Sequence, residues 1–182
     1  SVGRPLPHLR LSLSRSGEIQ VGGAAMLGYC GGEPHSGPVV TGDLGFLDAQ
    51  GYLHLTGRRK NVFITSFGRN VSPEWVEAEL TACPGIRQAV VFGEARPWNV
   101  ALIVSPLAGR EAGRATLNQA LAHANRGLPD YAQVRLWIAA DAPFTAHNGL
   151  ATASGRPRRQ AIFESYRERI GPLYQEAAHG VL

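Results

Sequence analysis

Three short polar motifs divide residues 41–74, and their spacing limits what this part of the chain can fold into. They are residues 41–45 (TGDLG), 57–60 (GRRK) and 67–74 (FGRNVSPE). The apolar runs between the motifs are short and are bounded by glycine and polar turn residues. Runs of that kind indicate short strands joined by turns, with a helix beginning only at the end of the third motif.

The residues before and within this stretch predict small β structure with little core of its own. Residues 9–13 alternate apolar and polar side chains, and Gly17 turns the chain into a second alternating run. A turn at residues 48–51 ends in Gly51, which adopts a left-handed conformation at little cost. His54 alternates with leucines, so we expect it to be a strand side chain that faces solvent.

Helical and strand patterns alternate after residue 71. Ser72 is a predicted N-cap and Pro73 suits the first helical position, with Val76 and Leu80 on the buried face. The further predicted elements are strands at 86–92 and 100–104, a helix at 113–126, a strand at 134–139 and a helix at 157–170. The predicted fold class is α+β: a small β subdomain followed by a compact, three-layer-like C-terminal domain with helices packed on a small sheet.

Length and composition exclude several classes of protein. At 182 residues the chain suits one modest domain, or one domain with part of another, and no apolar run reaches the roughly 18 residues of a membrane span. The net charge of +4 comes from scattered arginines without an aromatic ladder, so we expect no nucleic acid partner. Cys30 and Cys83 are too few for a zinc site or a disulfide framework. We expect buried reduced thiols, no metal site and a cytoplasmic protein.

In this order and at this spacing, the three motifs closely resemble those of the adenylate-forming superfamily. That superfamily includes acyl-CoA synthetases, firefly luciferase and the adenylation domains of peptide synthetases. Residues 1–7 and 26–29 resemble the segment that precedes the motifs, and residues 144–150 resemble a loop of long-chain acyl-CoA synthetases. The resemblance implies an enzyme that converts a carboxylic acid and ATP to an acyl-adenylate and pyrophosphate. It then implies transfer of the acyl group to a thiol, often that of CoA.

The resemblance also implies how the chain is divided. Residues 1–57 correspond to the last β subdomain of a large N-terminal domain, residues 58–60 to a hinge, and residues 61–182 to a C-terminal lid that rotates between the two half-reactions. The chain does not begin with methionine, and we expect it to be cut from a longer protein. Its own N-terminal domain would then be its partner and would supply the phosphate loop, the acyl pocket and the Mg²⁺ site. The chain alone is expected to be inactive.

Five residues of the motifs take roles by this resemblance. Asp43 would bind both ribose hydroxyls of ATP or AMP, and Arg58 would contact the ribose and a phosphate through its forked donors. Lys60 would be the hinge residue, which has to tolerate a large backbone rotation in solvent. Gly68 would let the backbone approach the pantetheine arm of CoA, and Arg69 would meet a phosphate. Each also has a plainer interpretation, as a turn, hairpin or surface residue.

The sequence departs from the family pattern at Arg156. The family places a catalytic lysine at this position, and its charge stabilises the transition state of adenylation. No lysine follows Lys60 in this sequence. Arginine keeps the charge but is planar and bulkier than lysine. Either Arg156 takes over the role, or Arg158 or Arg159 does, or adenylation is weak; we favour Arg156.

The predicted function is that of an AMP-forming carboxylic acid–CoA ligase, with an acid, ATP and CoA as small-molecule partners. One alternative is an acyl-AMP ligase that loads a carrier protein, which would have a protein-docking surface beside Gly68 instead of a pocket for the CoA nucleotide. The other alternative is a non-catalytic interaction module that kept the lid fold without the catalytic lysine. The sequence leaves these alternatives open.

Overall fold

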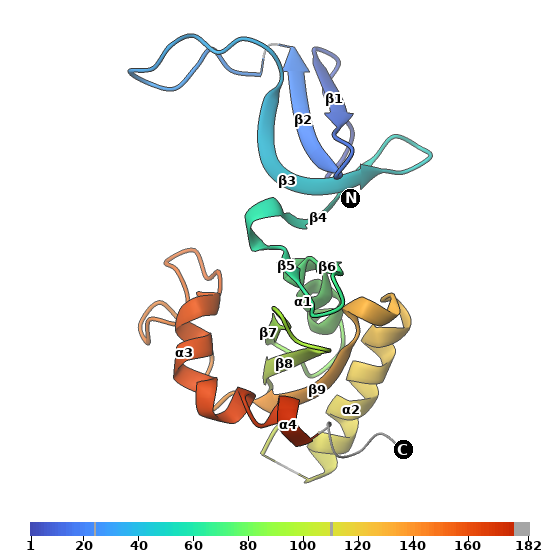
Figure 1. Cartoon of the computed structure of the whole chain (residues 1–182), viewed down its shortest axis with the longest axis vertical. Coiled ribbons are helices and arrows are strands. Elements are labelled where there is room, and N and C mark those ends of the chain that lie inside the picture. Colours follow the sequence, from blue (N-terminus) through green and yellow to red (C-terminus); the bar gives the residue numbers. More distant parts are fainter. Residues whose placement is uncertain (24, 110, 177–182) are drawn as a thin grey trace. The chain divides into compact units, whose positions relative to one another are not determined.

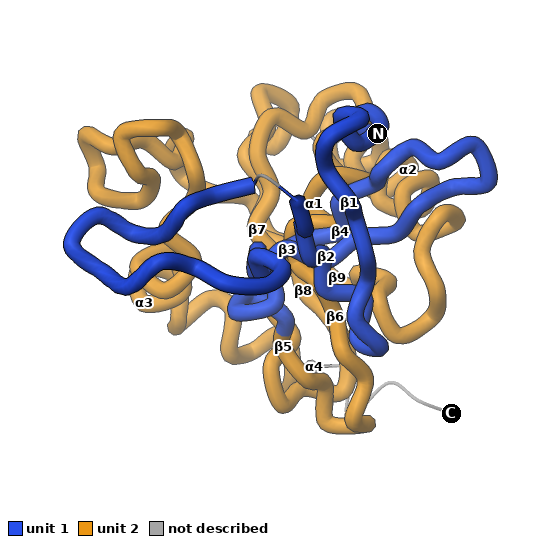
Figure 2. Tube along the Cα trace, turned by 90° about the horizontal axis from the view of Figure 1, so that it is seen from above, with its two compact units in different colours: residues 1–62 blue, residues 63–182 orange. Residues whose placement is uncertain are grey.

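The computed structural model describes residues 1–23, 25–109 and 111–176. The chain divides into two compact units, residues 1–62 and residues 63–182 (Figure 2). The assignment of the chain to an N-terminal subdomain, a hinge and a lid stays a prediction.

The first unit is a four-stranded antiparallel sheet in which the strands follow chain order (Figure 1). Its elements are β1 (Leu9–Leu13), β2 (Glu18–Gly23), β3 (Val39–Leu47), β4 (Leu53–Arg58) and a 3₁₀ turn, η1 (Arg59–Asn61). The predicted turn joins β3 to β4. There the Asp48 carboxylate accepts hydrogen bonds from the amides of Gln50 and Tyr52, and Gly51 has a φ of 80°. The predicted β structure is therefore confirmed.

This first unit buries very little apolar surface. Ile19, with 3% of its surface exposed, is the one buried hydrophobic residue among the described residues of the unit. Val40, Phe46 and Leu55 each leave half or more of their surface in solvent. The predicted scarcity of core is confirmed, and the sheet is held mainly by backbone hydrogen bonds and polar side-chain contacts.

Two predictions for the first unit need correction. His54 does not simply face solvent: its Nε2 lies 2.9 Å from Asp48 Oδ2, and its ring stacks on Phe46 with 4.9 Å between ring centroids. The turn carboxylate holds the ring in place, which an alternating pattern does not reveal. Cys30 is exposed because it lies in the connection between β2 and β3, outside the sheet, whereas Cys83 is buried as predicted.

The second unit is built on a three-stranded mixed sheet. Strands β7 (Gln88–Phe92) and β8 (Asn99–Val104) pair antiparallel, while β8 and β9 (Val134–Ala139) pair parallel. Figure 1 shows α2 and α3 on opposite sides of this sheet. The other elements are β5 (Phe63–Ile64), β6 (Asn70–Val71), α1 (Pro73–Thr81), α2 (Glu111–Arg126), η2 (Asp130–Ala132), α3 (Arg159–Ile170) and α4 (Leu173–Glu176).

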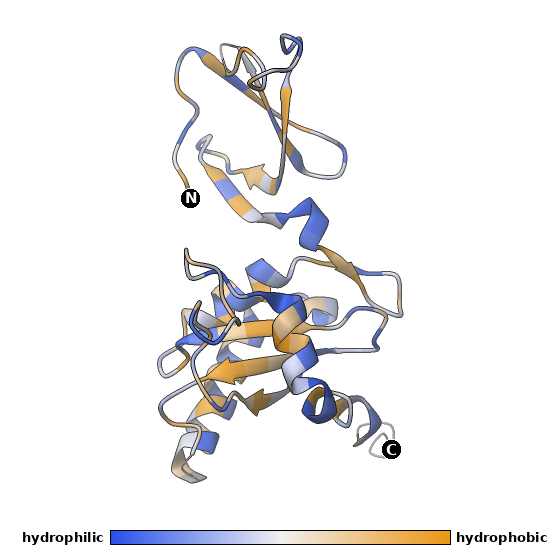
Figure 3. Ribbon diagram, turned by 90° about the vertical axis from the view of Figure 1, so that its left-hand side faces the viewer, coloured by the Kyte–Doolittle hydropathy of each residue, from blue (hydrophilic) through white to orange (hydrophobic). Residues whose placement is uncertain are grey.

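Each face of this sheet has its own hydrophobic core, because successive strand residues point to opposite faces. Val91 and Ile103 belong to the cluster that contains Leu80 of α1 and Leu117 of α2. The cluster on the other face includes Val90, Leu102, Phe144, Ile162, Tyr166 and Ile170. In Figure 3 the strands of this sheet are mostly orange, the colour of hydrophobic residues. Burying one such Leu, Ile or Val completely contributes about 1.5–3 kcal/mol. The α+β class and the three layers are therefore confirmed.

Two helix starts differ from the prediction. Helix α3 begins at Arg159, two residues later than predicted, because Pro157 pairs with Ala151 in an isolated β-bridge. Ser72 occupies the N-cap position of α1, but its hydroxyl does not cap a backbone amide. Instead the hydroxyl donates to Glu74 Oε2 at 3.5 Å, because the nearby carboxylate is a strong acceptor.

Among the helices of the described residues, none is both long and apolar enough to cross a membrane. The predicted cytoplasmic location stays a prediction.

Candidate functional site

Asp43 and Arg58 lie directly opposite each other on β3 and β4. Arg58 Nε is 2.6 Å from Asp43 Oδ1, and the Arg58 guanidinium also donates to the carbonyl oxygen of Thr41 at 3.3 Å. The Asp43 side chain is 28% exposed and that of Arg58 45% exposed. Solvent therefore reaches both groups, and a ligand with hydroxyls and an anionic group has access to a carboxylate and a cation at one place.

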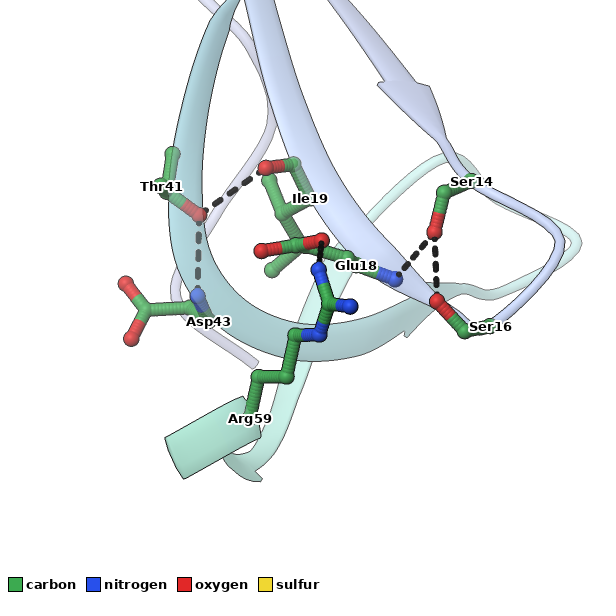
Figure 4. A network of polar contacts seen from close by, with 7 residues as sticks. All are labelled: Ser14, Ser16, Glu18, Ile19, Thr41, Asp43 and Arg59. Carbon is green, nitrogen blue, oxygen red and sulfur yellow. Dashed lines mark hydrogen bonds and ion pairs between the residues drawn. The ribbon is translucent and has the colours of Figure 1, made fainter. Parts of the chain in front are cut away.

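The residues around Asp43 fix its backbone. Thr41 Oγ1 accepts a hydrogen bond from the Asp43 amide at 3.1 Å and donates to the Ile19 carbonyl at 2.9 Å (Figure 4). Gly42, between them, has a φ of 75°, a left-handed conformation that favours glycine. The two hydrogen bonds of the Thr41 hydroxyl thus fix the backbone that presents the Asp43 carboxylate.

A second acid–arginine pair lies beside the first, and sequence reasoning missed it. Arg59 donates to Glu18 Oε2 at 2.8 Å, and Ser14 Oγ accepts from the Glu18 amide at 3.0 Å (Figure 4). The Glu18 side chain is only 7% exposed. The two consecutive arginines were the available sequence signal for a second pair. Neighbouring residues at a strand end point in different directions and therefore meet different carboxylates.

Lys60 lies in the 3₁₀ turn η1 and is exposed. The Val62 amide donates to the Arg58 carbonyl at 3.2 Å across this turn. Lys60 therefore lies two residues before the end of the first unit, which is at Val62. The hinge role itself stays a proposal.

The third motif forms a small hairpin between β5 and β6. Its tip contains Phe67, which is 74% exposed, and Gly68, which has a φ of 72°. A Cβ atom at Gly68 would meet no other atom within 4 Å, so the glycine is required by its backbone angle and not by crowding. The Gly68 amide donates to the Thr65 carbonyl at 2.9 Å, which closes the turn.

A pocket of about 760 Å³ opens beside this hairpin in the second unit. Two of its walls combine an arginine with an aromatic ring: Arg69 lies over Tyr131 at 5.8 Å and Arg135 over Trp98 at 4.8 Å from ring centroid. The remaining lining residues are Thr65, Phe67, Pro97, Asn118, Leu121, Ala122, Asn125, Asp130, Gln133 and Val134. Cations beside aromatic rings suit a ligand that has both phosphates and a flat base.

The pocket rim is held by a buried amide that the sequence did not indicate. Asn99 is fully buried, and its Nδ2 donates to the carbonyl oxygens of Tyr131 and Gln133 at 3.0 and 3.1 Å. These bonds fix η2, the turn that carries Tyr131. The signal was faint, because a single asparagine before a run of apolar strand residues resembles any strand start.

Arg156 lies in the connection between β9 and α3, away from the residues that line the pocket. Its amide donates to Thr152 Oγ1 at 3.1 Å and its carbonyl accepts from the Thr152 amide at 2.8 Å. Gly155 before it has a φ of 79°. The Arg156 residue is exposed, so a short, closed turn presents its guanidinium to solvent.

Arg159 is engaged elsewhere and does not share this exposure. Its guanidinium bonds both carboxylate oxygens of Glu77, at 2.5 and 3.2 Å, and the Val91 carbonyl at 2.9 Å. The Glu77 side chain is 14% exposed. Burial raises the pKa of Glu77, while Arg159 and the Val91 amide oppose that rise by bonding the carboxylate.

The structure thus gathers some predicted site residues and separates others. Asp43 and Arg58 meet in the first unit, and Arg69 joins the pocket in the second. Arg156 is at neither place. The described residues contain no group of three or more His, Cys, Asp or Glu side chains that would hold a metal ion.

Solved structures of two enzymes share this fold. The A domain of the carboxylic acid reductase from Segniliparus rugosus, in complex with AMP and a co-purified carboxylic acid, matches with a TM-score of 0.73 and 24% identity, over 96% of this chain and 32% of that one. The amide bond synthetase McbA from Marinactinospora thermotolerans matches with a TM-score of 0.65 and 24% identity, over 91% and 36%. The chain therefore has the fold of about a third of each of these two proteins.

The sequence gives the family directly. The family model of the AMP-binding enzyme C-terminal domain matches residues 60–178, well over half of the chain. The chain therefore belongs to the AMP-binding enzyme C-terminal domain family, and the predicted relationship is confirmed.

Curated relatives are named as CoA ligases. The long-chain-fatty-acid–CoA ligase FadD15 of Mycobacterium tuberculosis is 31% identical over 97% of this chain and 34% of its own length. The 2-succinylbenzoate–CoA ligase of Lactococcus lactis is 32% identical over 52% of this chain and 22% of its own length. The chain thus spans about a third or less of these relatives.

Proposed function

We propose that the protein to which this chain belongs is an AMP-forming carboxylic acid–CoA ligase. The Asp43–Arg58 pair carries the proposal, because an acceptor for ribose hydroxyls and a cationic donor for a phosphate stand on neighbouring strands. The names of the related CoA ligases support the same reaction class.

In the first half-reaction, a carboxylate oxygen of the acid attacks the α-phosphorus of ATP. The bond from that phosphorus to the bridging oxygen of the β-phosphate breaks, and pyrophosphate leaves with the electron pair. Arg156 would offset the negative charge that builds up on the α-phosphate in the transition state. The Mg²⁺ that accompanies ATP would be held by residues outside this chain.

In the second half-reaction, the CoA thiolate attacks the acyl carbon and AMP leaves. The second unit would rotate about Lys60 between the two steps, which fits its exposed position at the end of the first unit. Gly68 would then approach the pantetheine arm. The pocket beside it supports CoA as the acceptor, since the guanidinium groups of Arg69 and Arg135 in its lining suit the phosphates of CoA.

A carrier protein is the second candidate acceptor. Phe67 at the hairpin tip is 74% exposed, as a protein-docking residue would be. The A-PCP didomain of the carboxylic acid reductase from Segniliparus rugosus, in complex with AMP, also has this fold, with a TM-score of 0.73 and 25% identity, over 96% of this chain and 28% of that one. Thioester formation with CoA, compared with formation on a phosphopantetheinyl carrier protein, decides between the acceptors.

Pyrophosphate release by the full-length protein tests the proposal. We expect the wild type to release pyrophosphate in the presence of ATP and a carboxylic acid. The variant Arg156→Lys should release it faster if Arg156 occupies the catalytic position. No release by either protein, together with no ATP binding, would contradict the proposal and favour a non-catalytic module.

A further inference from the structure

The segment that carries Arg156, between Phe144 and Arg159, is attached to β7 at both ends. β7 is an edge strand of the three-stranded sheet. At the first attachment, the Gln88 side chain donates to the Phe144 carbonyl at 3.0 Å and accepts from the Phe144 amide at 2.8 Å. Phe144 is itself 2% exposed within the hydrophobic cluster on that face. The segment therefore leaves the sheet at a fixed point.

The second attachment is the ion pair between Glu77 and Arg159. Arg159 Nη1 donates to the Val91 carbonyl, and Glu77 Oε1 accepts from the Val91 amide at 2.8 Å. One side-chain pair thus satisfies both outward backbone groups of a β7 residue. With the two side chains 14% and 29% exposed, the pair is largely shielded from water, which strengthens it.

Between these attachments the segment closes on itself. The Ala151 amide donates to the Thr145 carbonyl at 2.9 Å, and the Arg158 amide donates to the Leu150 carbonyl at 2.8 Å. Arg156 is three residues from Arg159, and three residues span at most roughly 11 Å. A displacement of Arg159 would therefore be passed on to Arg156 with little slack.

We propose that Glu77 and Arg159 are positioning residues that hold the Arg156 turn in its productive place, with Gln88 as the attachment at the other end. This inference rests on the proposed role of Arg156 in adenylation. It also assigns Arg159 a task other than replacing the family lysine, because its guanidinium already bonds three acceptors.

A purely structural role would look different in kinetics. Loss of a structural tie between α1 and α3 lowers stability and reduces both half-reactions together. Loss of positioning lowers the rate of adenylation alone, because Arg156 acts only in that step. A misplacement of about 1 Å at a catalytic group costs roughly 100-fold in rate.

The test compares three variants in the full-length protein. Arg159→Gln removes the attachment of Arg159 to Glu77 and β7, which we call the tether, and leaves the Glu77 carboxylate buried. The double variant Glu77→Gln/Arg159→Gln removes both charges, so stability should recover in part while the tether stays absent. Asp141→Asn is the matched control, because it breaks an exposed ion pair of α3, in which Arg169 lies 2.8 Å from the Asp141 carboxylate.

Two measurements decide the outcome. In the single and double tether variants we expect kcat for pyrophosphate release to fall roughly 100-fold, with KM for ATP within twofold and with thioester formation from supplied acyl-adenylate unchanged. Hydrogen exchange of the amides in residues 152–158 should accelerate at least tenfold. Asp141→Asn should change none of these quantities.

The inference fails if adenylation recovers with stability in the double variant, or if both half-reactions fall alike. It also fails if exchange in residues 152–158 stays at the wild-type rate. A wild type that releases no pyrophosphate contradicts the proposed function instead, and hydrogen exchange then still tests the tether.

Discussion

The two units of this chain are stabilised in opposite ways. In the second unit, a hydrophobic sheet lies between helices, and side chains such as Val90 and Leu102 are fully buried. In the first unit, the described residues include one buried hydrophobic residue, Ile19, and the ordered contacts around it are polar. The difference shows that the second unit has the core of an independent domain, whereas the first depends on its strand ladder and on charged pairs.

The candidate site residues are also divided between these two differently stabilised units. The Asp43–Arg58 pair belongs to the unit with little core, and the arginine-lined pocket and Arg156 belong to the well-packed unit. A well-packed unit keeps a pocket and a turn rigid on its own surface. The proposed nucleotide pair instead relies on local hydrogen bonds, such as those of Thr41.

The largest effect should follow from a cavity in the second unit. Leu102→Ala should lower the free energy of unfolding by about 2–5 kcal/mol, because Leu102 is completely buried. Chemical denaturation followed by tryptophan fluorescence measures it, since Trp75, Trp98 and Trp137 all belong to this unit.

The matched change in the first unit is Leu55→Ala, at a leucine that is 51% exposed. The opening free energy of the β3 and β4 amides, measured by hydrogen exchange, should change by no more than about 0.5 kcal/mol. Equal losses in the two units would contradict the comparison.

The next effect concerns the ion pair of the second unit. Arg159→Gln should lower the free energy of unfolding by about 3 kcal/mol near pH 8, because it leaves Glu77 buried without its cation. Burial already raises the pKa of Glu77, and removal of Arg159 raises it further.

A carboxyl group with a raised folded pKa stabilises the fold at low pH and loses that contribution as pH rises through the folded pKa. The loss in Arg159→Gln should therefore be larger at pH 8 than at pH 5, as measured by urea denaturation at both values. Asp141→Asn provides the control, and its effect should stay below about 1 kcal/mol at either pH. A loss of stability that is larger at pH 5 than at pH 8 would show that the pKa of Glu77 is not raised in the folded state.

A smaller effect is expected at the hairpin tip. Gly68→Ala should cost about 1–2 kcal/mol, because Gly68 has a left-handed backbone that an alanine adopts with strain. Gly109→Ala is the control: a Cβ there also meets no atom within 4 Å, and its φ is not left-handed. Thermal unfolding compares them, and equal shifts would remove the argument from backbone angle.

The smallest effect belongs to the exposed turn of the first unit. The bond from His54 and the amides of Tyr52 and Gln50 lower the pKa of Asp48. A carboxyl group with a lowered folded pKa contributes stability at neutral pH, and that contribution is lost as pH falls through the folded pKa. Asp48→Asn should therefore destabilise the β3–β4 turn slightly at pH 7 and not at pH 2. Hydrogen exchange at the two pH values checks this, and a larger loss at pH 2 would contradict it.

The sequence predicted the elements well wherever periodicity was the deciding signal. The strand at 134–139 and the buried face formed by Val76 and Leu80 are found as predicted. The start of α3 was misplaced, because a proline suits both a helix start and a bridge such as that between Ala151 and Pro157.

Contacts between residues that are far apart in the chain were harder to predict from the sequence. Candidate roles for Asp43 and Arg58 came from the resemblance of their motifs, but the Asp43–Arg58, Glu18–Arg59 and Glu77–Arg159 pairs depend on strand register and helix packing. The bonds from Asn99 to the pocket rim likewise join residues more than thirty positions apart. No local pattern records such pairings, since each residue type is common at protein surfaces.

The central claim is that the first unit binds the nucleotide and that Arg156 of the second unit acts on the reaction. Steady-state pyrophosphate release by the full-length variants Asp43→Ala and Arg156→Ala tests it most directly. We predict that Asp43→Ala raises KM for ATP, and that Arg156→Ala lowers kcat by roughly 100- to 1,000-fold with little change in KM. Wild-type kcat in Arg156→Ala, or an unchanged KM in Asp43→Ala, would contradict the account.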